Sequence, residues 1–307
     1  MNNYTKSFKH FRTEYNRMRR LYLVTIFSYE KSWNAINDEL HEKKVSVNTE
    51  YKYKDEIIAR SHRELDKNLS ERYGKMLRES LLIKLVSILE IYFSDVLIEI
   101  STVSKNPFKT PENREYKIAQ LLDITDISEI QNSIIRDRVR GIVLSGFSKT
   151  KKFLENNIKI NLKVSEVNLL DIEQMYDNRN LLVHAGGIID DIYTLKYLGT
   201  VDKVPKRIEI CENNFLHSLD TAYNFISEID IQIEEKFQIP SIPFKKSIER
   251  KKEKISNTSK KVAIKARIKF ISDEDAPRVF KEDFSFGFTT KYTLSDISFE
   301  YIQKDEH

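Results

Sequence analysis

Residues 177–187 read DNRNLLVHAGG and combine a guanidinium, an amide and an imidazole within two helical turns: Arg179, Asn180 and His184. When a ribose 2′-OH attacks the adjacent phosphate, that hydroxyl must lose a proton and the leaving 5′-oxygen must gain one. Histidine has the side-chain pKa nearest neutrality for either transfer. Arginine offers paired N–H donors to the charge that grows on the phosphorane and does not deprotonate. These residue types therefore indicate RNA cleavage without a metal.

Helical spacing puts four polar side chains on one narrow stripe of residues 171–184: Glu173, Asp177, Asn180 and His184. Asn180, one turn before His184, is placed to orient the imidazole, and we interpret Glu173 and Asp177 as supporting residues. At 100° per residue, Arg179 lies about 140° from His184. Two such helices that face each other would bring the arginine of one to the histidine of the other more easily than one helix alone.

The same pattern predicts how this helix begins, packs and ends. Asp171 is the expected N-cap, and the pair Gly186-Gly187, in a chain with only seven glycines, is expected to end the helix after His184. At that end the helix dipole favours the protonated imidazole. Three side chains are expected to pack inward: Ile172, Tyr176 and Val183.

The pattern Arg179-Asn180-x-x-x-His184 resembles the signature of the HEPN superfamily, which includes many RNA-cutting toxins. The resemblance implies a helical bundle that dimerises with its motif helices face to face. It also implies a composite site that cuts RNA without metal and leaves a 2′,3′-cyclic phosphate. The implied setting is a toxin–antitoxin or antiphage (abortive-infection) system, with an antitoxin or defence partner protein. In one toxin subgroup a partner nucleotidyltransferase modifies a Tyr two residues after the His, but Gly186 stands there.

Other interpretations stay open. Arg179 could be a surface residue paired with Glu173 or Asp177, and His184 a cation at a helix end. The chain could be a non-catalytic HEPN-like module that binds RNA, nucleotide or a partner protein. It could also be a plain helical interaction protein.

Composition favours a soluble, mostly helical protein of the cytoplasm. Apolar residues make up 40% and charged residues 32% of 307, with seven Gly and six Pro. The single Cys211 excludes a disulfide framework, and we find neither a signal peptide nor an apolar run long enough for a membrane span. There is no CxxC, HExxH or glycine-rich phosphate loop, so we expect no metal and no cofactor.

We predict a mainly α fold: an HEPN-like helical bundle with a small C-terminal antiparallel β appendage. The predicted parts are a helical domain (1–240), a basic linker or exposed helix (241–261) and a β-rich appendage (262–307). Periodicity and capping signals predict helices over residues 4–40, 55–69, 70–102, 111–120, 126–146, 149–161, 171–184 and 213–237, with loop and short strands over 188–210.

Two further features bear on RNA binding. Three arginines of the predicted helix 126–146 could attract phosphates, although a solvated charged face is the simpler interpretation of each: Arg136, Arg138 and Arg140. Glu90 lies inside the most apolar predicted helix, so we expect it to be paired or near the cleft.

Overall fold

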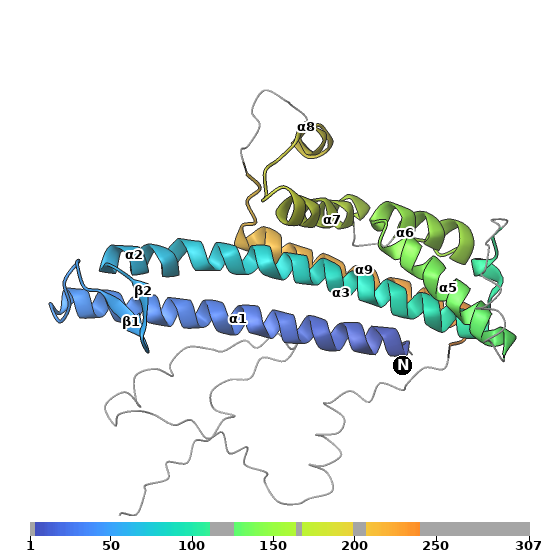
Figure 1. Cartoon of the computed structure of the whole chain (residues 1–307), viewed down its shortest axis with the longest axis horizontal. Helices are drawn as coiled ribbons and strands as arrows, with labels where there is room; N and C mark the ends of the chain where they lie inside the picture. Colours follow the sequence, from blue (N-terminus) through green and yellow to red (C-terminus); the bar gives the residue numbers. More distant parts are fainter. Residues whose placement is uncertain (1–3, 111–125, 164–167, 199–206, 240–307) are drawn as a thin grey trace, which may run out of the picture. The chain divides into compact units, whose positions relative to one another are not determined.

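The computed structural model describes residues 4–110, 126–163, 168–198 and 207–239. Three long helices run side by side in it (Figure 1): α1 (Lys6–His41), α3 (Tyr73–Val103) and α9 (Glu212–Phe237). Shorter helices cover the side of α3 away from α1: α5 (Ile127–Val143), α6 (Phe147–Phe153) and α7 (Leu169–His184). The prediction of a mainly α fold is confirmed.

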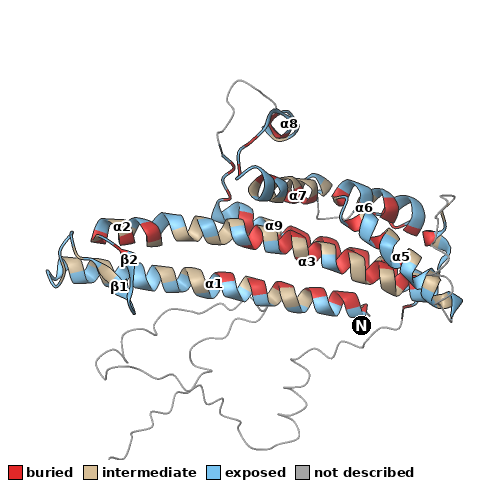
Figure 2. Cartoon of the chain, viewed as in Figure 1, coloured by how far each residue is buried: buried red, intermediate tan, exposed pale blue. Residues whose placement is uncertain are grey.

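Helix α3 lies at the centre of the apolar core because it is apolar on several sides. It packs against α1, α5, α7 and α9, and its buried residues lie between Leu81 and Ser101 (Figure 2). The facing side of α1 carries buried residues at three- and four-residue spacing: Phe8, Phe11, Tyr15, Met18 and Tyr22. Each such side chain contributes about 1.5–3 kcal/mol through burial, so the predicted periodicity accounts for the packing of α1.

A buried carboxylate ties the start of α1 to the other long helices. Asp230 of α9 accepts hydrogen bonds from the Thr5 backbone N–H (2.9 Å), the Thr5 hydroxyl and the Tyr92 hydroxyl (2.9 Å). Thr5 is also the N-cap of α1, since its Oγ1 accepts from the Phe8 N–H. Burial raises the pKa of Asp230 to about 6, although the three donors lower it. We call Thr5, Tyr92 and Asp230 the N-terminal clamp.

The segment between α1 and α3 differs from its prediction. A two-stranded antiparallel hairpin, β1 (Tyr51–Tyr53) and β2 (Glu56–Ala59), replaces the first part of the helix predicted over 55–69. Lys54 has φ 56°, which turns the chain between the strands. Helix α2 (His62–Lys67) follows, and its N-cap is Ser61, whose side chain accepts from the Glu64 N–H.

A helix start predicted at Ser70 is also wrong. Helix α2 continues through a π-helical turn, η1 (Asn68–Arg72), directly into α3. Because Ser61 already caps the first turn, no new start is needed at residue 70.

Around α5 the predicted pattern holds where the chain is described. Asp126, the first residue of the helix predicted over 126–146, accepts from the Ser128 N–H and caps α5. Helix α6 continues into the π-helical turn η3 (Leu154–Ile158), and a short 3-10 turn, η2 (Asn106–Phe108), follows α3. The helix predicted over 111–120, the basic segment 241–261 and the β appendage 262–307 lie outside the described residues. Among the helices of the described ranges, none has the length and apolar run needed to cross a bilayer.

Candidate functional site

The motif helix α7 begins three residues earlier than predicted. Asn168 is its N-cap and accepts from the Leu170 N–H (3.1 Å). Asp171 lies in the first turn instead, and its carboxylate is 3.2 Å from His217 Nε2 of α9. The prediction of Asp171 as the cap is therefore wrong, because an equally good capping amide precedes it.

The predicted glycine stop after His184 is confirmed. Gly186 has φ 59° and Gly187 has φ 82°, and the Gly187 N–H donates to the Leu181 carbonyl (2.8 Å). Such a left-handed exit satisfies carbonyls that the helix end leaves open. The Ile208 N–H in turn donates to the Gly187 carbonyl (2.8 Å), which fastens the helix end to the chain before α9.

One side of α7 packs into the core. Ile172, Met175, Tyr176 and Leu181 are buried, and the Tyr176 ring stacks on Phe147 with centroids 5.3 Å apart. Val183 is 49% exposed, so its predicted burial is wrong. Its position near the end of α7 leaves it beyond the face that the core covers.

Arg179 turns toward α3. Its Nη2 donates to the Glu90 carboxylate, and the two side chains are only 20% and 18% exposed. Burial raises the pKa of Glu90, while Arg179 lowers it. Among the residues described, the buried Arg179 Nε has no hydrogen-bond partner. Arg179 is therefore held by Glu90, and the alternative pairing with Glu173 or Asp177 is wrong.

A segment that was not predicted to be helical covers Glu173 and Asp177, which we call the acidic stripe of α7. Helix α8 (Asp191–Tyr193) and the π-helical turn η4 (Thr194–Leu198) replace the loop and strands predicted there, and residues 199–206 lie outside the description. The Asp177 carboxylate accepts from Lys196 Nζ (2.8 Å) and the Tyr197 hydroxyl (2.7 Å). The spacing of Tyr193, Lys196 and Tyr197 was the helical signal available in the sequence.

The Glu173 carboxylate is also paired with lysines. It lies 3.2 Å from Lys151 of α6 and 3.5 Å from Lys196. Burial alone would lower the pKa of Lys196, but its contacts with Asp177 and Tyr197 raise it. Glu173 and Asp177 thus serve to hold the covering segment on α7.

Asn180 and His184 stand apart from these pairs. Both are exposed, and within the described part of the chain neither side chain makes a hydrogen bond or an ion pair. The hydrogen bond expected from Asn180 to the imidazole is therefore not formed, and Arg179 does not meet His184 in this single chain. Apolar side chains that are 46–76% exposed are frequent here and in the covering segment: Val183, Ile188, Ile192, Leu195 and Leu198.

The three arginines of α5 lie outside the apolar core. Arg136 and Arg140 are exposed and Arg138 is half-buried, on a helix whose Ile135, Val139 and Val143 pack inward. Across the described ranges, no group of three His, Cys, Asp or Glu side chains is placed to hold a metal ion.

Comparisons with models of known protein families, with curated proteins and with solved structures find no match to this chain. Any function therefore has to be argued from the site itself.

Proposed function

We propose that this protein is a metal-independent endoribonuclease of the HEPN type, which acts on RNA as a homodimer. One observation carries the proposal. Among the described residues, the polar side chains of α7 have partners except for Asn180 and His184, which lie at its exposed end. Arg179 precedes Asn180 in the chain and is held in place by Glu90. Exposed groups without structural partners are available to a substrate.

The proposed reaction uses both protomers. One His184 takes the proton of the ribose 2′-OH, which attacks the adjacent phosphorus and displaces the 5′-oxygen. The imidazolium formed in this way gives the proton to that oxygen, while Arg179 of the other protomer faces the phosphate, and the products are a 2′,3′-cyclic phosphate and a 5′-hydroxyl. Arg179 meets the charge on the phosphorane, and Asn180 orients the imidazole or the phosphate.

The direction of the side chains supports the proposed dimer. Arg179 points to α3 while His184 lies about 140° further round α7, so a second copy brings the two groups together more directly. Exposed apolar residues next to the motif, such as Val183, Ile192 and Leu195, would be covered in that dimer. Arg136, Arg138 and Arg140 would then supply weak contacts to RNA phosphates.

The biological setting rests on the resemblance alone. A nuclease of this type in the cytoplasm must be inhibited until it is needed. We therefore expect a toxin or antiphage effector with an antitoxin or defence partner protein.

The test uses purified protein and RNA with excess EDTA. We expect RNA cleavage with 2′,3′-cyclic phosphate ends, reduced at least about 100-fold in His184→Ala and Arg179→Ala. His10→Ala, an exposed histidine on α1, is the matched control. Equal cleavage by all variants would overturn the assignment of the site. RNA binding without cleavage by the wild type would favour the non-catalytic HEPN-like module.

A further inference from the structure

Helix α1 carries apolar side chains on a side that does not face the core. Four of them, within two turns, are 47–63% exposed: Leu21, Leu23, Val24 and Phe27. Single exposed apolar residues are normal on a protein surface, but a group of them on one element marks a site of interaction. These residues lie outside the motif helix α7 and its covering segment, so the proposed nuclease site does not explain them.

Helical geometry brings three of these residues into one stripe with two cations. At 100° per residue, Leu23, Val24 and Phe27 fall within an arc of about 100°, and the core-facing side of α1 is centred about 150° from the middle of that arc. The arc also contains Arg20, one turn before them, and Lys31, one turn after them, and both are exposed. We call these five residues the outer face of α1.

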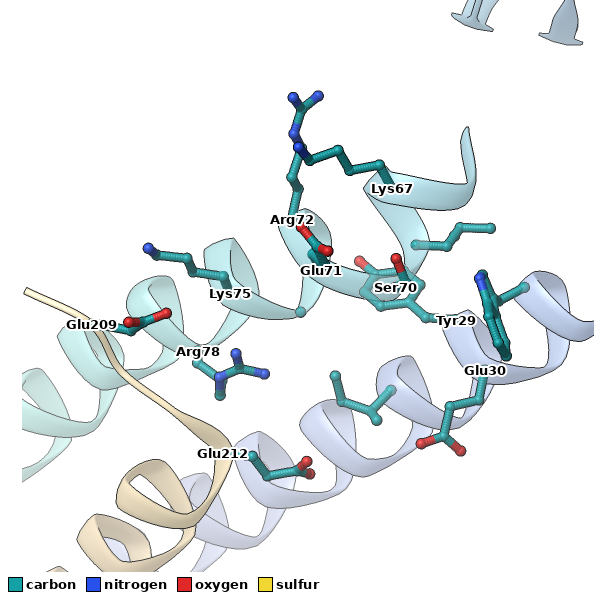
Figure 3. Close-up of a pocket in the computed structure, with 14 residues that line it drawn as sticks. Tyr29, Glu30, Lys67, Ser70, Glu71, Arg72, Lys75, Arg78, Glu209 and Glu212 are labelled. Carbon is teal, nitrogen blue, oxygen red and sulfur yellow. The ribbon is translucent and has the colours of Figure 1, made fainter. Parts of the chain in front are cut away.

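The charged side chains of the outer face are both cations. Within the described ranges, Arg20 forms no hydrogen bond or ion pair, and the Lys31 ammonium lies 5.5 Å from the centroid of the Phe27 ring. The acidic residues of the neighbouring turns lie outside the arc. Glu14 is paired with an arginine one turn later, and Glu30 lines the cavity between α1, η1 and α3 (Figure 3). An apolar stripe with a cation at each end complements a partner that combines apolar side chains with carboxylates.

A second copy of this chain does not fit the outer face. If two α1 helices packed antiparallel about the middle of the stripe, Arg20 of one copy would face Lys31 of the other. In a parallel pair each cation would face its own counterpart. Like charges opposed across an interface disfavour the contact, so the charges select a different chain.

A lipid bilayer fits the outer face less well than a protein does. Segments that bind anionic membranes through charge have clusters of about 4–8 lysines and arginines. The outer face has only Arg20 and Lys31, one at each end of an apolar stripe. This arrangement suits a partner of limited length better than an extended charged surface.

We propose that the outer face of α1 docks an amphipathic helix of another protein, whose apolar stripe is flanked by acidic residues. Arg20, Leu23, Val24 and Phe27 stand at positions i, i+3, i+4 and i+7, the spacing at which the side chains of one helix pack between those of another. Carboxylates of the partner then pair with Arg20 and Lys31. Docking at this place does not depend on nuclease activity at the motif.

Fluorescence anisotropy with synthetic peptides and the full-length protein tests the proposal. The probe is a labelled helical peptide of about 20 residues, with leucine at positions i, i+3, i+4 and i+7 and glutamate on both flanks of that stripe. The comparison peptides are a lysine-flanked counterpart and a scrambled form of the glutamate peptide. We expect saturable binding of the glutamate peptide at micromolar concentration, and binding of the other two that is weaker by about tenfold or more.

Two double variants locate the binding on the outer face. Leu23→Ser/Phe27→Ser should weaken binding of the glutamate peptide by about tenfold or more, because the apolar contact is lost. Arg20→Glu/Lys31→Glu should reverse the preference, so that the lysine-flanked peptide binds more tightly than the glutamate peptide. Melting temperatures check that each variant is folded, and the single substitutions are measured if a double variant is not.

Ile127→Ser/Leu144→Ser is the matched control, since it removes two apolar side chains that are 73% and 65% exposed at the ends of α5, and it should bind the peptide like the wild type. Sedimentation of the Leu23→Ser/Phe27→Ser variant should give the wild-type mass. Any of four results would overturn the proposal. These are no saturable binding of the glutamate peptide, equal affinity of the wild type and Leu23→Ser/Phe27→Ser, a preference that Arg20→Glu/Lys31→Glu leaves unchanged, or a smaller mass, which would show that a second copy covers this face.

Discussion

Two carboxylates that are removed from solvent, Asp230 and Glu90, have different kinds of partner. In the N-terminal clamp, the fully buried Asp230 is surrounded by donors from Thr5 and Tyr92. At the motif, Glu90 is partly buried and is paired with the Arg179 guanidinium, on a helix-end region that also carries the exposed Asn180 and His184. We call these last four residues the motif face.

The difference separates a structural cluster from a candidate site. Asp230 accepts three hydrogen bonds. Such pairing is expected, because a buried polar group without a hydrogen bond costs about 1–3 kcal/mol. The motif face keeps one buried guanidinium nitrogen without a hydrogen-bond partner among the described residues, and its amide and imidazole meet solvent. Within the described ranges, the Asn180 amide and the His184 imidazole make no contact that stabilises the fold, so they are available to a substrate.

The clamp should give the largest effect, and that effect depends on pH. The pKa of Asp230 is about 6 when folded against an ordinary value of 3.8, so the folded chain binds its proton more tightly than the unfolded chain. Protonated Asp230 therefore stabilises the folded chain. This contribution to the free energy of unfolding is complete below pH 3.8 and is lost as the pH rises through 6. From about 1.4 kcal/mol per pKa unit, it amounts to about 3 kcal/mol.

Urea unfolding at pH 4.5 and pH 8 measures this effect. We expect the free energy of unfolding of Asp230→Asn to fall less between these pH values than that of the wild type. An equal fall in both proteins would show that Asp230 is not the titrating group.

Removal of the arginine from the motif face should have the next largest effect. Arg179→Ala leaves the Glu90 carboxylate partly buried without its cation, which costs about 1–3 kcal/mol. In that background Glu90→Gln should recover part of the loss, because a neutral amide is less costly to bury. Urea unfolding of the wild type, the two single variants and the double variant gives the coupling energy between Arg179 and Glu90. A value near zero would contradict the pairing.

The glycine exit of α7 should give a smaller effect. Gly187→Ala places a Cβ 3.2 Å from Arg207 Nε at φ 82°, which costs about 1–2 kcal/mol. Gly186→Ala is the control, since its φ is also positive but its Cβ would meet open space. Thermal melting should therefore rank Gly187→Ala below Gly186→Ala, and the reverse order would contradict the packing at this exit.

The covering segment should contribute least. Lys196→Ala removes partly exposed ion pairs to Asp177 and Glu173, which are worth below about 1 kcal/mol and are screened by salt. The difference in melting temperature from the wild type should shrink in 1 M NaCl. A difference that salt leaves unchanged would indicate that packing, rather than charge, holds η4 on α7.

Local patterns predicted the helices well and long-range contacts poorly. The apolar spacing of Phe8, Phe11 and Tyr15 and the Gly186-Gly187 stop are local signals, and the structure follows them. The N-caps Ser61 and Asn168 were missed because several polar residues nearby could cap equally well.

The partners in the candidate site could not be predicted in the same way. Glu90 and Arg179 are 89 positions apart, and only the packing of α7 on α3 brings them together. Lys196 covers the acidic stripe for the same kind of reason, since its position depends on how α8 and η4 fold back. Periodicity within one helix contains no information on which other helix lies beside it.

The most direct test of the central claim mixes two inactive variants. If Arg179 of one protomer acts with His184 of the other, a dimer of one Arg179→Ala chain and one His184→Ala chain keeps one intact site. Co-refolded in equal amounts, the two variants should recover about a quarter of wild-type RNA cleavage, because half of the dimers are mixed. No recovery, with mixed dimers shown to form, would contradict a composite site on the motif face.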